Sequence, residues 1–118
     1  MIRQEIFDKV LAHLRERGKA AVDGGKCKYR ATDGSKCAVG CLIPDARYYS
    51  ELEGHGPIYL LEEGALPGIE AFHGSFLAEL QEAHDGGLAT FGMDNWEFEM
   101  RDIAVKHRLQ YKVNHDQD

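Results

Sequence analysis

Three cysteines and one histidine are the residues of this sequence whose types could together hold a metal ion. Nine residues separate Cys27 from Cys37, and three separate Cys37 from Cys41. His55 could supply a fourth ligand, and zinc takes four such ligands in a tetrahedron. Paired C-x-x-C knuckles are missing from the sequence, however, and cysteine often serves as a small buried apolar residue. We therefore expect no cofactor and interpret the thiols as core residues, with a zinc site as the alternative.

The same thiols could also act as a nucleophile or as a redox group. Cys37 follows a tight turn, and at the start of a helix its pKa would fall, which favours the reactive thiolate. Three histidines could serve as its base, namely His55, His73 and His84. The chain carries no local signature of a cysteine enzyme and no G-x-G-x-x-G, P-loop or G-x-S-x-G motif. We therefore expect a protein that is not an enzyme, and a thiol enzyme or redox module is the alternative.

Acidic side chains dominate the middle of the chain. The 118 residues carry a formal net charge of −6, yet residues 1–47 carry +4 and residues 101–118 carry +1. Residues 48–100 contain eleven Asp and Glu and neither Lys nor Arg. This stretch predicts an acidic face that attracts a basic partner and repels nucleic acid. A surface that only keeps the protein in solution is the alternative interpretation.

A segment rich in Tyr and Arg leads into the acidic stretch. Tyr and Arg are among the side chains that most often anchor protein interfaces. We therefore predict a partner-binding surface of seven residues: Arg47, Tyr48, Tyr49, Glu51, Glu53, Glu62 and Glu63.

Apolar periodicity predicts a mainly helical α+β fold around a single core. Three principal helices are expected over residues 2–17, 69–84 and 94–108, because apolar side chains recur there at helical spacing. A short helix is expected over residues 58–61. The same spacing places three large apolar side chains on buried faces: Ile2, Phe72 and Trp96.

Helix ends are predicted from capping residues. Gly86-Gly87 should end the second principal helix, with His84 in its last turn complementing the helix dipole. Asp94 and Glu97 have the spacing of a capping box at the start of the third, and Phe98 could form a hydrophobic staple with Met93.

The region between the first two principal helices is expected to hold the small β-structure. Asp33-Gly34 predicts the turn of a hairpin, because Gly tolerates positive φ. The apolar run over residues 37–43 is interpreted as a short buried helix in which Ala38 and Gly40 allow a close backbone approach. Residues 1–110 are expected to form one domain and residues 111–118 a frayed polar tail.

Location is expected to be cytoplasmic. The first ten residues carry charges and no apolar region of the kind found in secretory signals, and no apolar run reaches the length of a membrane span. An odd number of cysteines in such a chain favours reduced thiols.

The block from Cys27 to Asp45, which reads C-K-Y-R…D-G-S-K-C-A-V-G-C-L-I-P-D, resembles a group of small proteins encoded by bacteriophages and prophages. The segment L-Q-E-A-H-D at residues 80–85, followed by Trp96 and an I-A-x-x-H ending, is similar as well. The resemblance implies a phage or prophage accessory protein that acts in a bacterial cytoplasm. It implies neither a mechanism nor catalytic residues.

These observations together predict a small acidic accessory protein that binds a basic surface of a host bacterial protein and modulates or inhibits it. A nucleic-acid-binding or defence complex would present such a surface. Binding of this kind should weaken as salt rises. Direct contact with nucleic acid or with a membrane is not expected.

Overall fold

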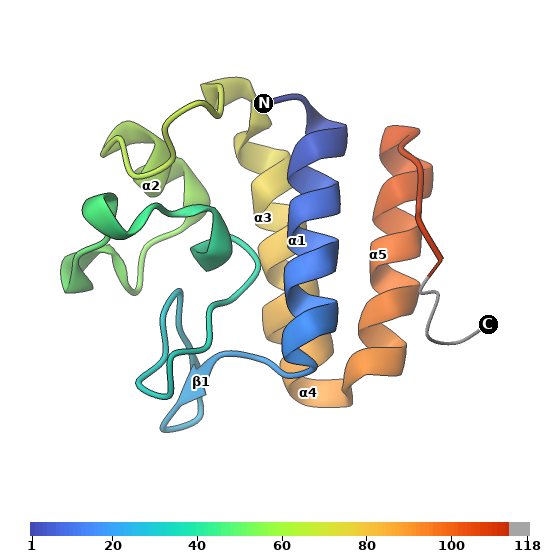
Figure 1. The fold of residues 1–118 in the computed structure, drawn as a ribbon, viewed down its shortest axis with the longest axis horizontal. Helices are drawn as coiled ribbons and strands as arrows, with labels where there is room; N and C mark the ends of the chain where they lie inside the picture. Colours follow the sequence, from blue (N-terminus) through green and yellow to red (C-terminus); the bar gives the residue numbers. More distant parts are fainter. Residues whose placement is uncertain (114–118) are drawn as a thin grey trace.

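Three long helices form the body of the protein, whose computed structural model describes residues 1–113 (Figure 1). They are α1 (Arg3–Arg17), α3 (Gly74–Glu82) and α5 (Met93–His107). All three turn apolar faces inward, and Phe7, Phe76 and Trp96 are completely buried where the helices meet. The predicted mainly helical fold with a single core is therefore confirmed, as is the core position of Trp96.

A lobe of short elements packs on the side of α1 and α3 that faces away from α5 (Figure 1). It contains the α-helix α2 (Pro57–Glu62) and four 3₁₀ helices, η1 (Gly40–Leu42), η2 (Asp45–Arg47), η3 (Ser50–Leu52) and η4 (Ala71–His73). Pro57 begins α2, as expected for a residue whose fixed φ suits the first helical position. The lobe thereby places the acidic residues 51–63 far from α5.

The hairpin lies earlier in the chain than predicted, with its turn at residues 24–25 and not at residues 33–34. Strands β1 (Val22–Asp23) and β2 (Lys26–Cys27) pair antiparallel, and Gly24-Gly25 make the turn with positive φ. The predicted turn at Asp33-Gly34 also exists, but it is closed by a single antiparallel bridge between Arg30 and Lys36 and not by paired strands.

Gly40 confirms the predicted close backbone approach in the run over residues 37–43. This run forms the short helix η1, and a β-carbon at Gly40 would collide with the backbone of Tyr29. The pairing of residues 29 and 30 with this run therefore depends on glycine at one position.

The second principal helix continues past Gly86-Gly87, where its end was predicted. After α3 the chain forms a π-helix, η5 (Ala83–Leu88), and then the short helix α4 (Ala89–Phe91). Neither Gly86 nor Gly87 adopts positive φ, and a β-carbon at Gly87 would collide with the Glu99 carboxylate of α5. The prediction was wrong because η5 packs against α5, and this tertiary contact outweighs the local preference of glycine to end a helix.

Several large apolar side chains expected inside lie outside. Ile2, Phe72 and Phe98 are each more than 60% exposed. Ile2 precedes α1, and Phe72 lies in the 3₁₀ turn η4, whose shorter repeat rotates it off the buried face of α3. The predicted capping box is also absent, because the Glu97 carboxylate instead accepts hydrogen bonds from Arg15 at 2.8 and 2.9 Å.

The end of the described chain packs on the helices. The Tyr111 hydroxyl donates to Glu97, and the Lys112 ammonium lies 3.1 Å from the Asp8 carboxylate. The rest of the predicted tail, residues 114–118, lies outside the described residues. Over residues 1–113, no helix combines the length and the apolar character needed to cross a membrane.

Candidate functional site

A polar cavity of about 250 Å³ lies where the hairpin, the η3 loop and the end of α3 meet. Its lining comprises Cys27, Lys28, Tyr29, Glu53, Gly54, His55, Gln81 and Asp85. Two carboxylates, Glu53 and Asp85, therefore face one small space, and in residues 1–113 neither forms an ion pair with a Lys or Arg side chain.

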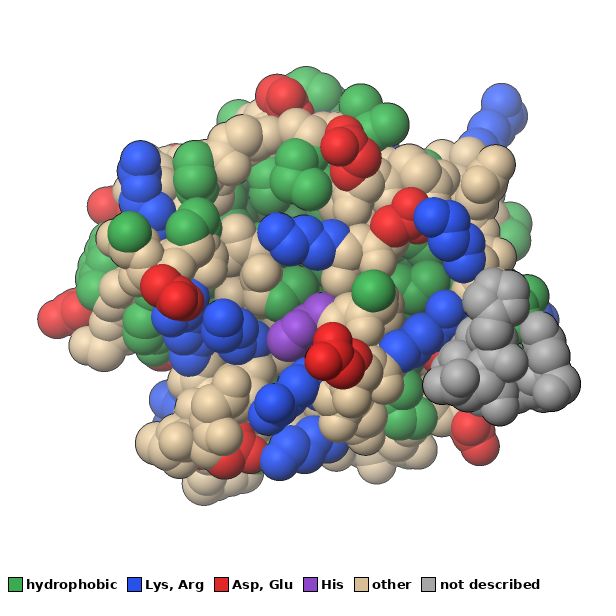
Figure 2. Space-filling model, viewed as in Figure 1, with side chains coloured by type: hydrophobic (Ala, Val, Ile, Leu, Met, Phe, Trp, Pro, Cys, Tyr) green, Lys and Arg blue, Asp and Glu red, His purple; other side chains and the backbone are tan. Residues whose placement is uncertain are grey.

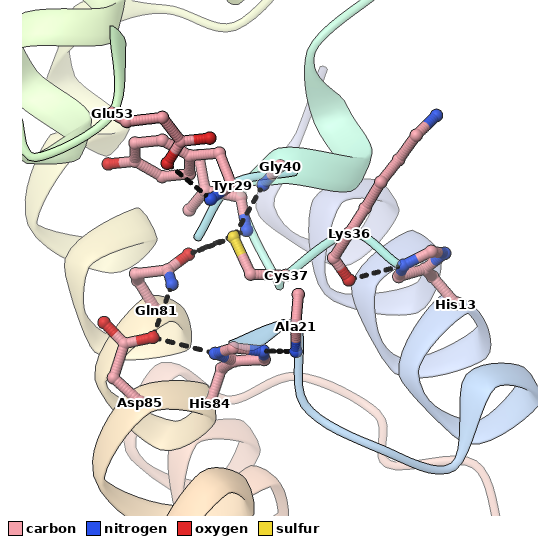
Figure 3. Close-up of polar contacts among 11 residues, drawn as sticks. His13, Ala21, Tyr29, Lys36, Cys37, Gly40, Glu53, Gln81, His84 and Asp85 are labelled. Carbon is pink, nitrogen blue, oxygen red and sulfur yellow. Dashed lines mark hydrogen bonds and ion pairs between the residues drawn. The ribbon is translucent and has the colours of Figure 1, made fainter. Parts of the chain in front are cut away.

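A continuous chain of hydrogen bonds holds the Asp85 carboxylate on the cavity wall (Figure 3). One of its oxygens, Oδ1, accepts from the Gln81 amide at 2.7 Å and lies 2.8 Å from Nδ1 of His84. Gln81 is fixed in turn, because its side-chain oxygen accepts from the Val39 backbone N–H at 3.0 Å and from the Cys37 thiol at 3.1 Å. The second Asp85 oxygen is left to the cavity.

The protonation of His84 follows from its contacts. The ring is completely buried, and its Nε2 accepts the backbone N–H of Ala21 at 3.0 Å. Because Nε2 must keep its lone pair, the ring proton lies on Nδ1 and is donated to Asp85. The interpretation of His84 as a cation that complements the dipole at a helix end is therefore wrong.

The π-helix η5 is the element that aims these two residues. A π-turn holds one residue more per hydrogen-bonded ring than an α-turn, and such turns occur frequently at functional sites. Here it lets His84 point inward to the hairpin while the next residue, Asp85, reaches the cavity.

The Glu53 carboxylate forms the opposite wall and organises the backbone beneath it. Its two oxygens accept the backbone N–H groups of Tyr29 and Arg30 at 2.9 and 3.0 Å. One oxygen also accepts the Tyr48 hydroxyl at 2.8 Å. Arg30 donates to the Ile43 carbonyl and forms an ion pair with Asp45 at 2.8 Å, which binds the lobe to this segment.

The thiols of this region are held in the protonated form. Burial raises the pKa of Cys27 to about 11, and the nearby charge of Asp85 adds to the effect. Burial also raises the pKa of Cys41 to about 12, and that of Cys37 still further. Since the thiolate is the nucleophile, these surroundings oppose nucleophilic catalysis at neutral pH.

The predicted zinc ligands are not brought together. Among residues 1–113, one group of three potential ligands has its atoms within 4.8 Å of one another, and it consists of Cys27, His84 and Asp85. His84 suits a metal poorly, because coordination through Nδ1 would move its proton to Nε2, against the Ala21 N–H. The Cys37 thiol donates a hydrogen bond to the side-chain oxygen of Gln81, and the Cys41 thiol donates one to the Ala38 carbonyl.

Beside the cavity lies a surface group that we call the acidic–aromatic patch, made of the exposed Tyr49, Glu51 and Glu63 and the half-buried Tyr59. The Tyr49 hydroxyl lies 3.5 Å from a Glu63 oxygen. Partial desolvation and the surrounding Glu63, Tyr59 and Glu51 raise the pKa of Tyr49. His55 stacks on Tyr59 with ring centroids 3.9 Å apart, and the same His55 lines the cavity. Patch and cavity therefore adjoin.

The seven predicted partner-binding residues fall into two groups. Tyr49, Glu51, Glu62 and Glu63 are exposed. Tyr48 and Glu53 are half-buried and make the internal contacts described above. Arg47 is exposed, and it donates a 3.1 Å hydrogen bond to the Gly64 carbonyl.

The eleven acids of residues 48–100 divide in the same way. Five have internal partners that fix the fold: Glu53, Glu70, Glu79, Asp85 and Glu97. Five of the other six are exposed, in the lobe or along the outer edges of α3 and α5: Glu51, Glu62, Glu63, Glu82 and Asp94. Glu99 is half-buried, and one of its carboxylate oxygens is buried with no hydrogen-bond partner among the described residues. Positive charge lies elsewhere on the surface: Lys and Arg side chains are spread across the face of the molecule drawn in Figure 2.

Sequence reasoning missed Gln81, His84 and Asp85 as one assembly. The sequence offers His84 as a possible base or helix-end residue and L-Q-E-A-H-D as part of a resemblance, but a polar triplet at one end of an amphipathic helix carries no signal of what it contacts. No protein-family model matches the chain, and neither a curated protein nor a solved structure matches it.

Proposed function

We propose that this chain is a small phage-type accessory protein that binds a basic surface of a bacterial host protein in the cytoplasm and thereby modulates it. The acidic–aromatic patch is the observation that supports the proposal. It combines two carboxylates with two tyrosines, which can hold an ammonium or guanidinium group by ion pairing and by cation–π contact.

The distribution of charge supports the same partner. The patch lies within a stretch of 53 residues that has neither Lys nor Arg, so few internal cations compete for it. Arg47, the nearest basic residue before this stretch, is engaged with the Gly64 carbonyl. A basic surface used by the host to hold nucleic acid would be a suitable target, because an acidic patch competes with phosphate for it.

The proposal is tested by capturing host proteins on the tagged chain at low and at high salt. We expect one stoichiometric partner that is retained at low salt and released as salt rises. The double variant Glu51→Lys/Glu63→Lys should lose this partner, because it reverses both charges of the patch.

The matched control is Glu16→Lys/Glu82→Lys, which makes the same change in net charge at two exposed acids outside the patch. It should retain the partner. If both double variants lose the partner equally, overall charge and not the patch is responsible, and the proposal fails. Capture that does not respond to salt would also contradict it.

A further inference from the structure

The outward face of α5 has a composition that the fold does not explain. Five residues at helical spacing share this face and are exposed: Asp94, Phe98, Arg101, Asp102 and Val105. Phe98 and Val105, at the centre of the face, are 65% and 73% exposed. Two large apolar side chains that lie two turns apart on one side of a surface helix are typical of a helix that packs against another.

The charges on this face are complementary to those on the same face of a second copy of α5 that packs antiparallel to it. Consider two copies of α5 packed antiparallel about a twofold axis that passes between Arg101 and Asp102. Phe98 of one copy then lies opposite the partner's Val105, and Arg101 opposite the partner's Asp102. Symmetry repeats each contact, so one register gives two apolar contacts flanking two ion pairs.

The acidic surface beside Asp102 favours the binding of a cation. Glu79, Glu82, Glu99 and Asp102 line a groove of about 240 Å³ between α3 and α5. Burial raises the pKa of Glu99, and the charges of Glu82 and Asp102 raise it further. An arginine placed there would relieve this repulsion between like charges.

We propose that the outward face of α5 is a self-association surface, on which a second copy of this chain docks antiparallel with Arg101 paired to the partner's Asp102. Two helices of 15 residues bury less area than a standard stable interface, so the dimer forms at high and dissociates at low protein concentration. The α2 lobe lies on the other side of the body, so both acidic–aromatic patches stay free (Figure 1).

Sedimentation velocity over a wide range of protein concentrations tests this inference on the full chain. We expect a monomer–dimer equilibrium. Arg101→Asp should weaken dimerisation by about tenfold or more, because it sets carboxylates opposite each other at two symmetric positions. The charge swap Arg101→Asp/Asp102→Arg should restore it. Both variants lose the contact of Arg101 with the Tyr111 ring, so their difference isolates the pairing between copies.

Phe98→Asp should abolish the dimer, whereas Phe72→Asp, at a residue of similar exposure on the lobe side, should leave it unchanged. A monomer at every concentration would overturn the inference, as would a charge swap that dimerises no better than the single reversal. The patch variant Glu51→Lys/Glu63→Lys should still dimerise. The test of the self-association surface is therefore independent of the test of the proposed partner surface.

Discussion

Cys27 shows how the surroundings of one residue decide its chemistry. Its thiol faces a cavity, where access alone would suggest reactivity. Burial and the Asp85 carboxylate nevertheless raise its pKa to about 11, so on the order of 10⁻⁴ of it is thiolate at neutral pH. Burial is the main reason that this thiol is inert, and the charge of a cavity carboxylate, Asp85, adds to it.

We predict that iodoacetamide alkylates Cys27 slowly at neutral pH and that the rate climbs until the pH reaches about 11. Asp85→Asn should speed alkylation at neutral pH, because removing a negative charge lowers the pKa of the thiol, while the amide oxygen still accepts from His84 and Gln81. Mass spectrometry of the Cys27 peptide measures the rate. Asp94→Asn, a change at an exposed residue of α5, should leave it unaltered. A rate that levels off near neutral pH would contradict the prediction.

The short elements of the lobe hold their positions through close backbone contacts. Gly40 of η1 lies so near the Tyr29 backbone that no β-carbon fits. Tyr29 in turn carries the N–H that Glu53 accepts and a hydroxyl that donates to the His55 carbonyl. One glycine thus sets the distance between η1 and the cavity wall.

Gly40→Ala should therefore destabilise the protein by about 1–3 kcal/mol, the usual cost of overpacking a tightly packed site. Urea unfolding measures this difference. Gly56→Ala is the matched control, because Gly56 has negative φ and nothing within 4 Å of its β-carbon position. Equal stabilities for the two variants would show that the backbones can separate at little energetic cost.

Helices with strong apolar periodicity could be predicted from the sequence. Elements that depend on tertiary contacts with distant parts of the chain could not. The helices α1 and α5 form where the spacing of apolar residues predicts them, since each buries one continuous face. The π-helix η5 was missed because local preference favours a stop at Gly86-Gly87, whereas the helix continues where η5 packs against α5.

The candidate site was hidden for a related reason. Its hydrogen bonds join residues 63, 44 and 42 positions apart: Ala21 with His84, Cys37 with Gln81, and Val39 with Gln81. Two of these five groups are backbone N–H groups, which every non-proline residue possesses and which leave no mark in a sequence. The exposed acids of residues 51–63, by contrast, were foreseeable from composition alone.

Half-buried carboxylates join the first long helix to the last. Glu97 joins α5 to Arg15 of α1 and to Tyr111, and Glu79 joins α3 to Lys106 and His107 of α5. Burial alone would raise the pKa of each carboxyl group, but the hydrogen bonds from these partners prevail and hold both pKa values below the ordinary one.

A carboxyl group whose pKa is lowered by folding stabilises the folded state above its ordinary pKa, and this stability is lost as the pH falls through the lowered value. We therefore predict that the free energy of unfolding decreases as the pH drops below about 4.5. Glu97→Gln should be less stable at neutral pH and should lose less on acidification. Urea unfolding at both pH values measures this. The exposed Glu16→Gln should behave as the wild type, and an unchanged acid response in Glu97→Gln would refute the assignment.

The π-helix η5 has a consequence for how the gene could vary. Because its turn contains one residue more than an α-turn, removing the codon of Asp85 would convert it to regular α-helix while leaving Leu88 and everything after it in register. The cavity would lose one of its two carboxylates and the bundle would keep its core. Most single-codon deletions inside a helix rotate all later side chains by about 100°, so this is a rare point at which a lineage could alter the cavity without losing the fold.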